Sequence, residues 1–136
     1  MRKNNEYKKL YDLLPLETPL SLLIEPTNIC NFQCVFCPTG NTDLLNLVNR
    51  PKGMMNLSLF KKIINDLCEF KQKVKKIYLY KDGEQFLNPD LFEMIKYVKS
   101  KNVAESVETT SNGSLIDHKK SIELIESDLD AIRFSI

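Results

Sequence analysis

Short apolar runs alternate with amphipathic helical stripes along this chain, and residues that favour turns separate them. Runs of about 4–8 apolar-rich residues are typical of strands, while apolar residues at i, i+3, i+4 and i+7 are typical of helices. Strands that alternate with helices favour parallel strands joined by right-handed helical crossovers. The sequence therefore predicts an α/β fold with four parallel strands, three crossover helices and an additional N-terminal helix. The expected strands are 20–25, 77–80, 106–110 and 131–136, and the expected helices are about 5–14, 56–70, 88–101 and 117–125.

Polar residues mark the expected starts of the crossover helices. Asn56 precedes the first helix and Asp117 the third, and both residue types are good N-caps. Asn88, followed by a proline, is the expected N-cap of the second. Cys68 falls on the apolar stripe of the first crossover helix, which predicts a small core residue rather than a metal ligand. Residues 38–55, rich in Pro, Gly, Asn and Thr, are expected to form an extended loop.

Composition and charge narrow the class of protein. The 136 residues suit one α/β domain over 20–136, preceded by a lead-in over 1–19. The net charge of +1 gives no electrostatic reason to expect a nucleic-acid or membrane partner. The first residues are polar and no long apolar segment follows them, so we expect neither a signal peptide nor a membrane span. Clustered cysteines without a secretion signal favour the reducing cytoplasm.

Three of the four cysteines, Cys30, Cys34 and Cys37, lie within eight residues directly after the first expected strand. An extended chain would spread them over about 25 Å, so only a curled loop can bring their sulfurs to one ligand. Thiolates select zinc, copper(I) or iron–sulfur clusters. Zinc normally takes a fourth ligand, for which only the distant Cys68 and His118 are available. Three thiolates on a cluster instead leave one iron open, and the spacing alone allows both interpretations.

The spacing C-x3-C-x2-C, with the aromatic Phe36 before the last cysteine, resembles the cluster loop of the radical S-adenosylmethionine (radical SAM) enzymes. Segment 25–28, Glu-Pro-Thr-Asn, resembles that family's lead-in to the loop. The resemblance implies that Cys30, Cys34 and Cys37 hold a [4Fe–4S] cluster. It also implies that the amino and carboxylate groups of S-adenosylmethionine bind the remaining iron.

Further matches follow the other expected strands. Gly83-Glu84 resembles the family's Gly-Gly-Glu motif, which implies contact with the methionyl amino group, although Asp82 replaces the first glycine. Asn112 belongs to a segment that resembles the family's Thr-Asn-Gly, and Ser135 resembles the serine near the ribose and methionyl carboxylate. Each match comes at the carboxyl end of a strand, where open α/β sheets and barrels bind ligands. We therefore expect these residues to share one rim with the cysteines.

By resemblance, the expected fold is a partial parallel βα barrel, the N-terminal portion of a radical SAM enzyme that stops after the fourth strand. Segment 50–55 resembles the corresponding segment of enzymes with a SPASM-type extension. Such an oxidoreductase would reductively cleave S-adenosylmethionine to a 5′-deoxyadenosyl radical, which abstracts hydrogen from a peptide or small-molecule substrate. The implied electron donor is a flavodoxin or a ferredoxin.

Two other hypotheses stay open on the sequence. The chain could be a non-catalytic iron–sulfur module, which would keep the cysteine loop and turn over nothing. It could also be a zinc-binding interaction module, which would need Cys68 or His118 beside the loop. No general acid or base is identifiable, and we expect the chain alone to be inactive.

Overall fold

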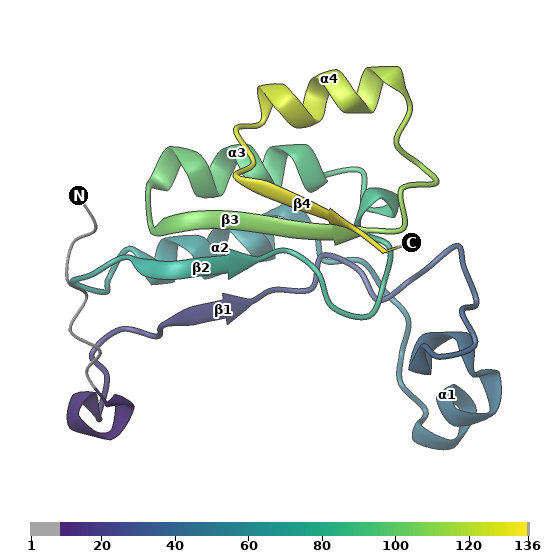
Figure 1. The fold of residues 1–136 in the computed structure, drawn as a ribbon, viewed down its shortest axis with the longest axis horizontal. Coiled ribbons are helices and arrows are strands. Elements are labelled where there is room, and N and C mark those ends of the chain that lie inside the picture. The colour runs from purple at the N-terminus through teal and green to yellow at the C-terminus, as the bar shows by residue number, and fades with distance from the viewer. Residues whose placement is uncertain (1–8, 136) are drawn as a thin grey trace.

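Four parallel strands form one sheet in the computed structural model, which describes residues 9–135 except for the side chains of Leu10 and Leu13. The strands lie in the order β1-β2-β3-β4, and each pairs with the next one along the chain (Figure 1). This arrangement confirms the predicted α/β class with parallel strands. The bounds are Ser21–Leu23 for β1, Val74–Tyr78 for β2, Ala104–Ser111 for β3 and Ala131–Phe134 for β4.

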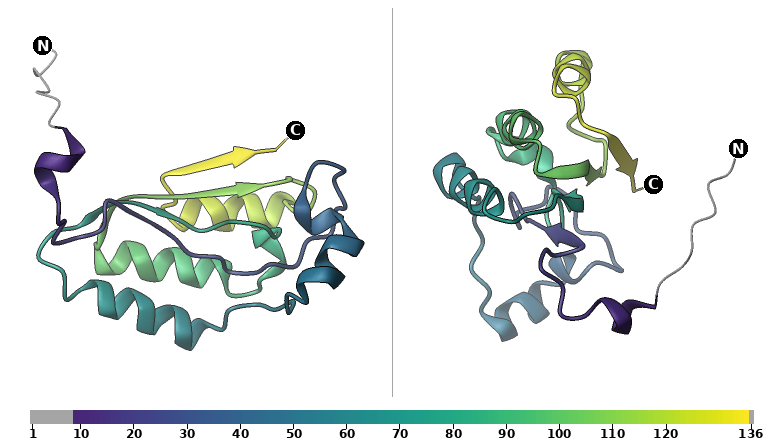
Figure 2. Two further views of the ribbon diagram at one scale, coloured as in Figure 1. Left: turned by 90° about the horizontal axis from the view of Figure 1, so that it is seen from below. Right: turned by 90° about the vertical axis from the view of Figure 1, so that its left-hand side faces the viewer.

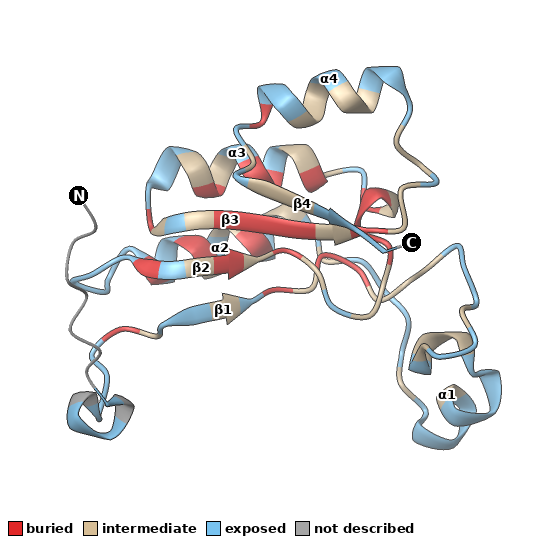
Figure 3. Cartoon of the chain, in the orientation of Figure 1, coloured by how far each residue is buried: buried red, intermediate tan, exposed pale blue. Residues whose placement is uncertain are grey.

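Helices α2, α3 and α4 cover one face of the sheet (Figure 2). Their apolar residues pack with strand residues such as Ile77 and Val107, which are 0% and 1% exposed. Figure 3 shows the buried residues where α2 and α3 meet β2 and β3. Each large apolar side chain buried there contributes roughly 1.5–3 kcal/mol to folding. The helices are Leu57–Leu67 (α2), Leu91–Lys101 (α3) and His118–Glu126 (α4), and among the described residues no helix is long and apolar enough to cross a membrane.

The predicted caps of α2 and α4 are confirmed. The Asn56 Oδ1 accepts a hydrogen bond from the Leu59 N–H at 2.8 Å. The Asp117 Oδ1 accepts one from the Lys120 N–H at 2.7 Å. Each cap satisfies a first-turn N–H group that lacks an intrahelical partner.

The predicted cap of α3 is wrong by two residues, because Asn88 is used for other contacts. α3 begins after Asp90, whose N–H donates to the Asn88 Oδ1 at 2.9 Å. Asn88 is 3% exposed, and its Nδ2 donates to the carbonyl oxygens of Pro26 and Met55 at 2.8 and 3.0 Å. The side chain therefore ties the loop after β2 to two segments that precede it in sequence.

Residues 38–55 contain a helix where the sequence predicted an extended loop. A 3-10 turn over Pro38–Gly40 leads into α1, Thr42–Val48. The Asn41 Oδ1 caps α1 by accepting from the Leu44 N–H at 2.9 Å. α1 projects away from the sheet (Figure 1), and its residues are exposed or half-buried. A short helix of this kind has no buried stripe, so hydrophobic periodicity does not predict it.

Two further expectations about the helices differ from the structure. Cys68 is exposed at the C-cap of α2, so the prediction of a core residue is wrong. α2 ends at Leu67, the last residue of its buried stripe, and the chain then turns toward β2. Of the predicted N-terminal helix, residues 5–8 lie outside the described residues, and Leu10–Leu13 forms a 3-10 helix rather than an α-helix.

The carboxyl ends of all four strands share one edge of the sheet (Figure 1). The cysteine loop, residues 30–37, follows β1 at this edge, and the loops after β2 and β3 lie there as well. Ser135 follows β4, and its N–H donates to the Ser111 carbonyl oxygen at 2.9 Å. The segments that the sequence predicted at one rim therefore do meet there.

Candidate functional site

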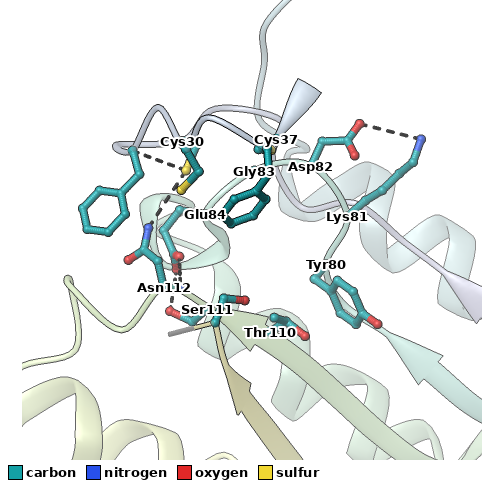
Figure 4. A pocket seen from close by; sticks show the side chains of 14 residues that line it. Cys30, Cys37, Tyr80, Lys81, Asp82, Gly83, Glu84, Thr110, Ser111 and Asn112 are labelled. Carbon is teal, nitrogen blue, oxygen red and sulfur yellow. Dashed lines mark hydrogen bonds and ion pairs between the residues drawn. The ribbon is translucent and has the colours of Figure 1, made fainter. Parts of the chain in front are cut away.

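A cavity of about 540 Å³ lies at the carboxyl edge of the sheet, a size typical of small-molecule sites. Figure 4 shows Cys30 and Cys37 on one side of it, Asn112 beside Cys30, and Tyr80 and Thr110 across from the cysteines. The cavity brings together every residue that the sequence predicted for the site. They are Cys30, Cys34, Phe36, Cys37, Gly83, Glu84, Asn112 and Ser135, and the lining also includes Phe32, Tyr80, Lys81, Asp82, Thr110 and Ser111.

The cysteine loop is curled, as its spacing required. The Cys37 N–H donates to the Cys34 carbonyl oxygen, and the Gly40 N–H donates to the Cys37 carbonyl oxygen, both at 3.0 Å. A Cβ atom on Gly40 would lie 2.5 Å from the Cys34 carbonyl oxygen. Glycine therefore lets the chain fold back against the loop that it has just left. Sequence reasoning missed Gly40, and its position three residues after the last cysteine was the available signal.

Polar groups from neighbouring segments lie against two of the thiols. The Phe32 N–H points at the Cys30 Sγ at 3.4 Å, and the Asn112 Nδ2 lies 4.0 Å from the same sulfur. The Thr39 Oγ1 is 3.0 Å from the Cys37 Sγ. Polar groups close to the sulfurs tune the potential of a thiolate-bound cluster.

All four cysteines, each within the described residues, carry free thiols. Among the residues described, no three His, Cys, Asp or Glu side chains already surround the position of a single metal ion. An iron–sulfur cluster takes one thiolate on each of several irons, so its ligands need not meet at one point. Thiols gathered along the wall of one cavity fit such a ligand.

The two residues considered as a fourth zinc ligand lie elsewhere. α2 runs from the carboxyl edge of the sheet back to the opposite edge, where Cys68 lies beside Lys101 and Asn102 (Figure 1). His118 is exposed at the first residue of α4. The position of Cys68 excludes it as a partner of the cysteine loop.

Gly83 brings the loop after β2 against the lead-in to the cysteine loop. A Cβ atom at this position would lie 2.2 Å from the Thr27 carbonyl oxygen and 2.8 Å from that of Ile29. The next N–H group, of Glu84, donates to the Ile29 carbonyl oxygen at 2.9 Å. The close approach that glycine permits therefore joins two segments of the protein, and contact of Gly83 with a methionyl amino group stays a prediction.

Glu84 is 2% exposed and connects the loop after β2 to the end of β3. Its Oε1 accepts from the Ser111 hydroxyl at 2.8 Å and from the Phe86 N–H at 3.2 Å. Its Oε2 accepts from the Asn112 N–H at 2.7 Å, and the Asn112 Nδ2 donates onward to the Asn31 Oδ1 at 2.9 Å. The buried carboxylate thereby fixes Asn112 relative to the cysteine loop.

Arg50 bridges two carboxylates beside the cavity, which the sequence did not predict. Its guanidinium pairs with Asp82 and, at 2.7 Å, with the Glu25 Oε2. The Asp82 N–H donates to the Glu25 Oε1 at 2.9 Å. The hydrogen bond to Asp82 is the largest influence on the pKa of Arg50, which is raised despite partial burial of the guanidinium. Asp82 stands where the family motif has its first glycine, and its carboxylate is used in this ion pair.

Segment 50–55 packs along the lead-in to the cysteine loop. Met54 forms an antiparallel bridge with Thr27, whose hydroxyl donates to the Gly53 carbonyl oxygen at 3.0 Å. The Met55 N–H donates to the Pro26 carbonyl oxygen at 2.8 Å. The segment thus packs against the lead-in from outside, and the SPASM-type extension that its resemblance implied stays a prediction.

A family model described as the radical SAM superfamily matches residues 24–136. The chain belongs to the radical SAM superfamily. The family predicted from the cysteine spacing and the strand-end motifs is therefore confirmed.

Curated relatives of this radical SAM chain are much longer than the chain. It is 30% identical over 115 residues to the tungsten-containing aldehyde ferredoxin oxidoreductase cofactor-modifying protein of Pyrococcus furiosus, covering 85% of this chain and 30% of that protein. It is also 30% identical over 117 residues to a probable GTP 3′,8-cyclase of Methanococcus maripaludis, covering 85% and 36%. The chain thus spans about a third of the length of these two relatives.

Solved structures share the fold of the radical SAM chain. BtrN in complex with AdoMet and 2-DOIA matches with a TM-score of 0.68 and 20% identity, over 84% of this chain and 44% of that one. anSMEcpe with bound AdoMet and a Cp18Cys peptide matches with a TM-score of 0.60 and 24% identity, over 83% and 30%. At these identities the likeness shows the fold, and it agrees with the predicted partial barrel of parallel strands.

Proposed function

We propose that this chain carries the cluster site and the S-adenosylmethionine site of a radical SAM enzyme. Cys30, Cys34 and Cys37 would hold a [4Fe–4S] cluster through their thiolates. When bound, that cluster would supply the electron that cleaves S-adenosylmethionine to methionine and a 5′-deoxyadenosyl radical, which abstracts hydrogen from a substrate. One observation carries the proposal: the three thiols share a single cavity with the residues that end β2, β3 and β4.

The chain's own groups suit the cosubstrate. Asn112 and Ser135 line the cavity and present an amide and a hydroxyl, which can donate to carboxylate and ribose oxygens. Phe36 also lines it, remains 84% exposed, and offers an aromatic face to a nucleoside. Gly83 and Glu84 would hold the adjoining loop in register with the cysteine loop. The bound AdoMet named for both solved neighbours supports this assignment.

Metal analysis of four single variants tests the cluster assignment. After anaerobic reconstitution, the parent chain should hold about four irons and four sulfides, and the cluster should be reducible to a paramagnetic state. Cys30→Ala, Cys34→Ala and Cys37→Ala should each lose that iron, because two thiolates cannot retain a cubane exposed to water. Cys68→Ala is the matched control and should keep it. Iron loss in Cys68→Ala, or one zinc per chain in the parent, would refute the assignment.

The cosubstrate assignment has a separate test. Addition of S-adenosylmethionine to the reduced, loaded chain should change its paramagnetic spectrum, because a ligand reaches the open iron. Release of methionine would then distinguish an enzyme from a non-catalytic iron–sulfur module. An unchanged spectrum at saturating S-adenosylmethionine would contradict the proposal.

The remaining partners follow from this chemistry. A one-electron reduction needs a donor such as a flavodoxin or a ferredoxin, and the hydrogen comes from a peptide or small-molecule substrate. Residues 9–135 present no side chain to which we assign general acid or base chemistry. The chain's own residues would bind and orient the cosubstrate and the substrate, and would exclude water from the site.

A further inference from the structure

Lys76, Glu108 and Arg133 meet on the face of the sheet opposite α2, α3 and α4, and we call them the charged trio. They come from the adjacent strands β2, β3 and β4. Successive strand residues point to opposite faces, and the neighbouring Ile77 and Val107 pack into the core with the helices. The trio therefore occupies the other face of the sheet.

Glu108 is the centre of the charged trio. It is 3% exposed, and its Oε1 accepts from the Lys76 Nζ at 2.5 Å and from the Ser106 hydroxyl at 3.2 Å. Its Oε2 lies 2.6 Å from the Arg133 Nη1. The hydrogen bond from Lys76, followed by that from Arg133, lowers the pKa of Glu108 to about 2. The carboxylate is thus ionised near neutral pH, and two cations around one anion leave one positive charge in excess.

The excess charge is accessible. The Lys76 and Arg133 side chains are 42% and 53% exposed, and ion pairs of that exposure contribute little stability. A guanidinium has five N–H donors in a planar fork, so its contact with Glu108 leaves donors for a second anion. Glu108 fixes where both cations stand, which reduces the entropy that a ligand must overcome.

The charged trio adjoins the cavity along the same strands. Thr110 and Ser135 line the cavity, and Glu108 and Arg133 precede them by two residues, so they point to the same side of the sheet. Two residues along a strand span about 6.6 Å. Glu108 and Arg133 therefore lie about that distance before Thr110 and Ser135, the residues of their strands that line the cavity.

Two tyrosines lie between the cavity and the cations. Tyr80 lines the cavity, and Tyr78 meets it edge to face with ring centroids 5.8 Å apart. The Lys76 Nζ lies 5.9 Å from the Tyr78 centroid. A molecule that extends from the cavity to the charged trio would thus pass an aromatic surface before it reaches the cations.

We propose that Lys76 and Arg133, positioned by Glu108, bind an anionic group, a carboxylate or a phosphate, of the enzyme's substrate. The assignment to substrate rests on the proposed function, because the substrate must reach from this face into the cavity where S-adenosylmethionine would lie. An anchored end would determine which C–H bond faces the cavity. The charged trio would therefore select substrates that carry an anionic group.

Calorimetric titration of the metal-free, S-adenosylmethionine-free chain tests the anion site by itself. Inorganic phosphate and succinate are titrated separately, with sodium chloride adjusted to constant ionic strength. At least one should bind with millimolar affinity, and Arg133→Gln should weaken it by about tenfold, the loss expected for one charge-assisted contact. Arg133→Lys should recover part of that affinity. Lys99→Gln removes the same charge from an ion pair with Asp130 and should change nothing.

Each possible result either supports or overturns the proposal. Binding of phosphate alone or succinate alone identifies the anionic group, and binding of both identifies a site that does not discriminate. No binding, or equal affinity in Arg133→Gln and Lys99→Gln with all variants folded by circular dichroism, would overturn it. A second arm adds S-adenosylmethionine to the loaded chain: displacement of the anion would assign the cations to the cosubstrate carboxylate and overturn the substrate assignment. The titration of the metal-free chain contains no iron, so its result can still be interpreted if the cluster proposal fails.

Discussion

A side chain at position 83 would collide with the backbone of Thr27, because a Cβ atom there would lie 2.2 Å from the Thr27 carbonyl oxygen. No rotamer relieves this contact, since both partners are fixed to the main chain. Glycine is therefore needed at position 83 so that the loop after β2 can pack against the lead-in to the cysteine loop.

Gly83→Ala should lower the free energy of unfolding by about 1–3 kcal/mol, the usual cost of overpacking. The lead-in must move to admit the methyl group, so iron retention after reconstitution should fall as well. Gly53→Ala is the matched control, because among the described residues no atom lies within 4 Å of a Cβ built there. Urea denaturation measures the difference, and equal midpoints for the two variants would contradict the close-packing argument.

Glu84→Gln should destabilise the chain by about 1–3 kcal/mol, because the variant loses a charged acceptor in a buried site. An amide has only one oxygen, so it cannot replace both carboxylate oxygens, which accept from Ser111 and from the Asn112 N–H. Denaturation of the variant is compared with that of Glu69→Gln, a change at an exposed residue. If both variants melt alike, Glu84 does not brace the two loops.

The sequence predicted the parts of this site that follow strand ends. Cys30, Gly83, Asn112 and Ser135 are distant in the chain, yet parallel strands bring their carboxyl ends to one edge. The family resemblance selected these residues, and the strand pattern predicted that they meet. The same reasoning failed for Cys68, because a stripe of apolar residues does not show at which residue the helix ends.

Contacts between loops could not be predicted in this way. Arg50 and Asp82 are separated by 32 residues, and neither position follows a hydrophobic period that would relate them. The role of Glu84 was also hidden, because sequence shows an acidic residue in a turn and not the donors that surround it. Gly40 is a similar case, since its position after the last cysteine marks a turn but does not show that a side chain there would strike the Cys34 carbonyl oxygen.

Arg50→Gln should cost about 1–2 kcal/mol of stability, because it leaves the carboxylates of Glu25 and Asp82 close together without a shared cation. Arg50→Lys should give an intermediate value, since a single ammonium group lacks the fork that contacts both. Lys52→Gln, at an exposed residue of the same segment, is the control. Urea denaturation at low and moderate salt measures the effect, and an unchanged midpoint in Arg50→Gln would show that the bridge is unimportant.

The carboxylate of Glu108 should make the free energy of unfolding depend on pH in the acidic range. Its pKa is lowered from 4.5 to about 2 in the folded chain, so the unfolded chain binds more protons between these values. Stability from Glu108 is therefore fully present above about pH 5 and is lost as the pH falls toward 2. Glu108→Gln should lower the free energy of unfolding at pH 7 by no more than about 1 kcal/mol, because both partner cations are partly exposed. The stability of the variant should fall less between pH 5 and pH 2 than that of the parent. Glu105→Gln, at an exposed residue of the same strand, should keep the parent's pH dependence. Denaturation of the three chains across this range is the measurement. Parallel curves for Glu108→Gln and the parent would mean that the ion pairs of Glu108 are no stronger in the folded chain than in the unfolded one.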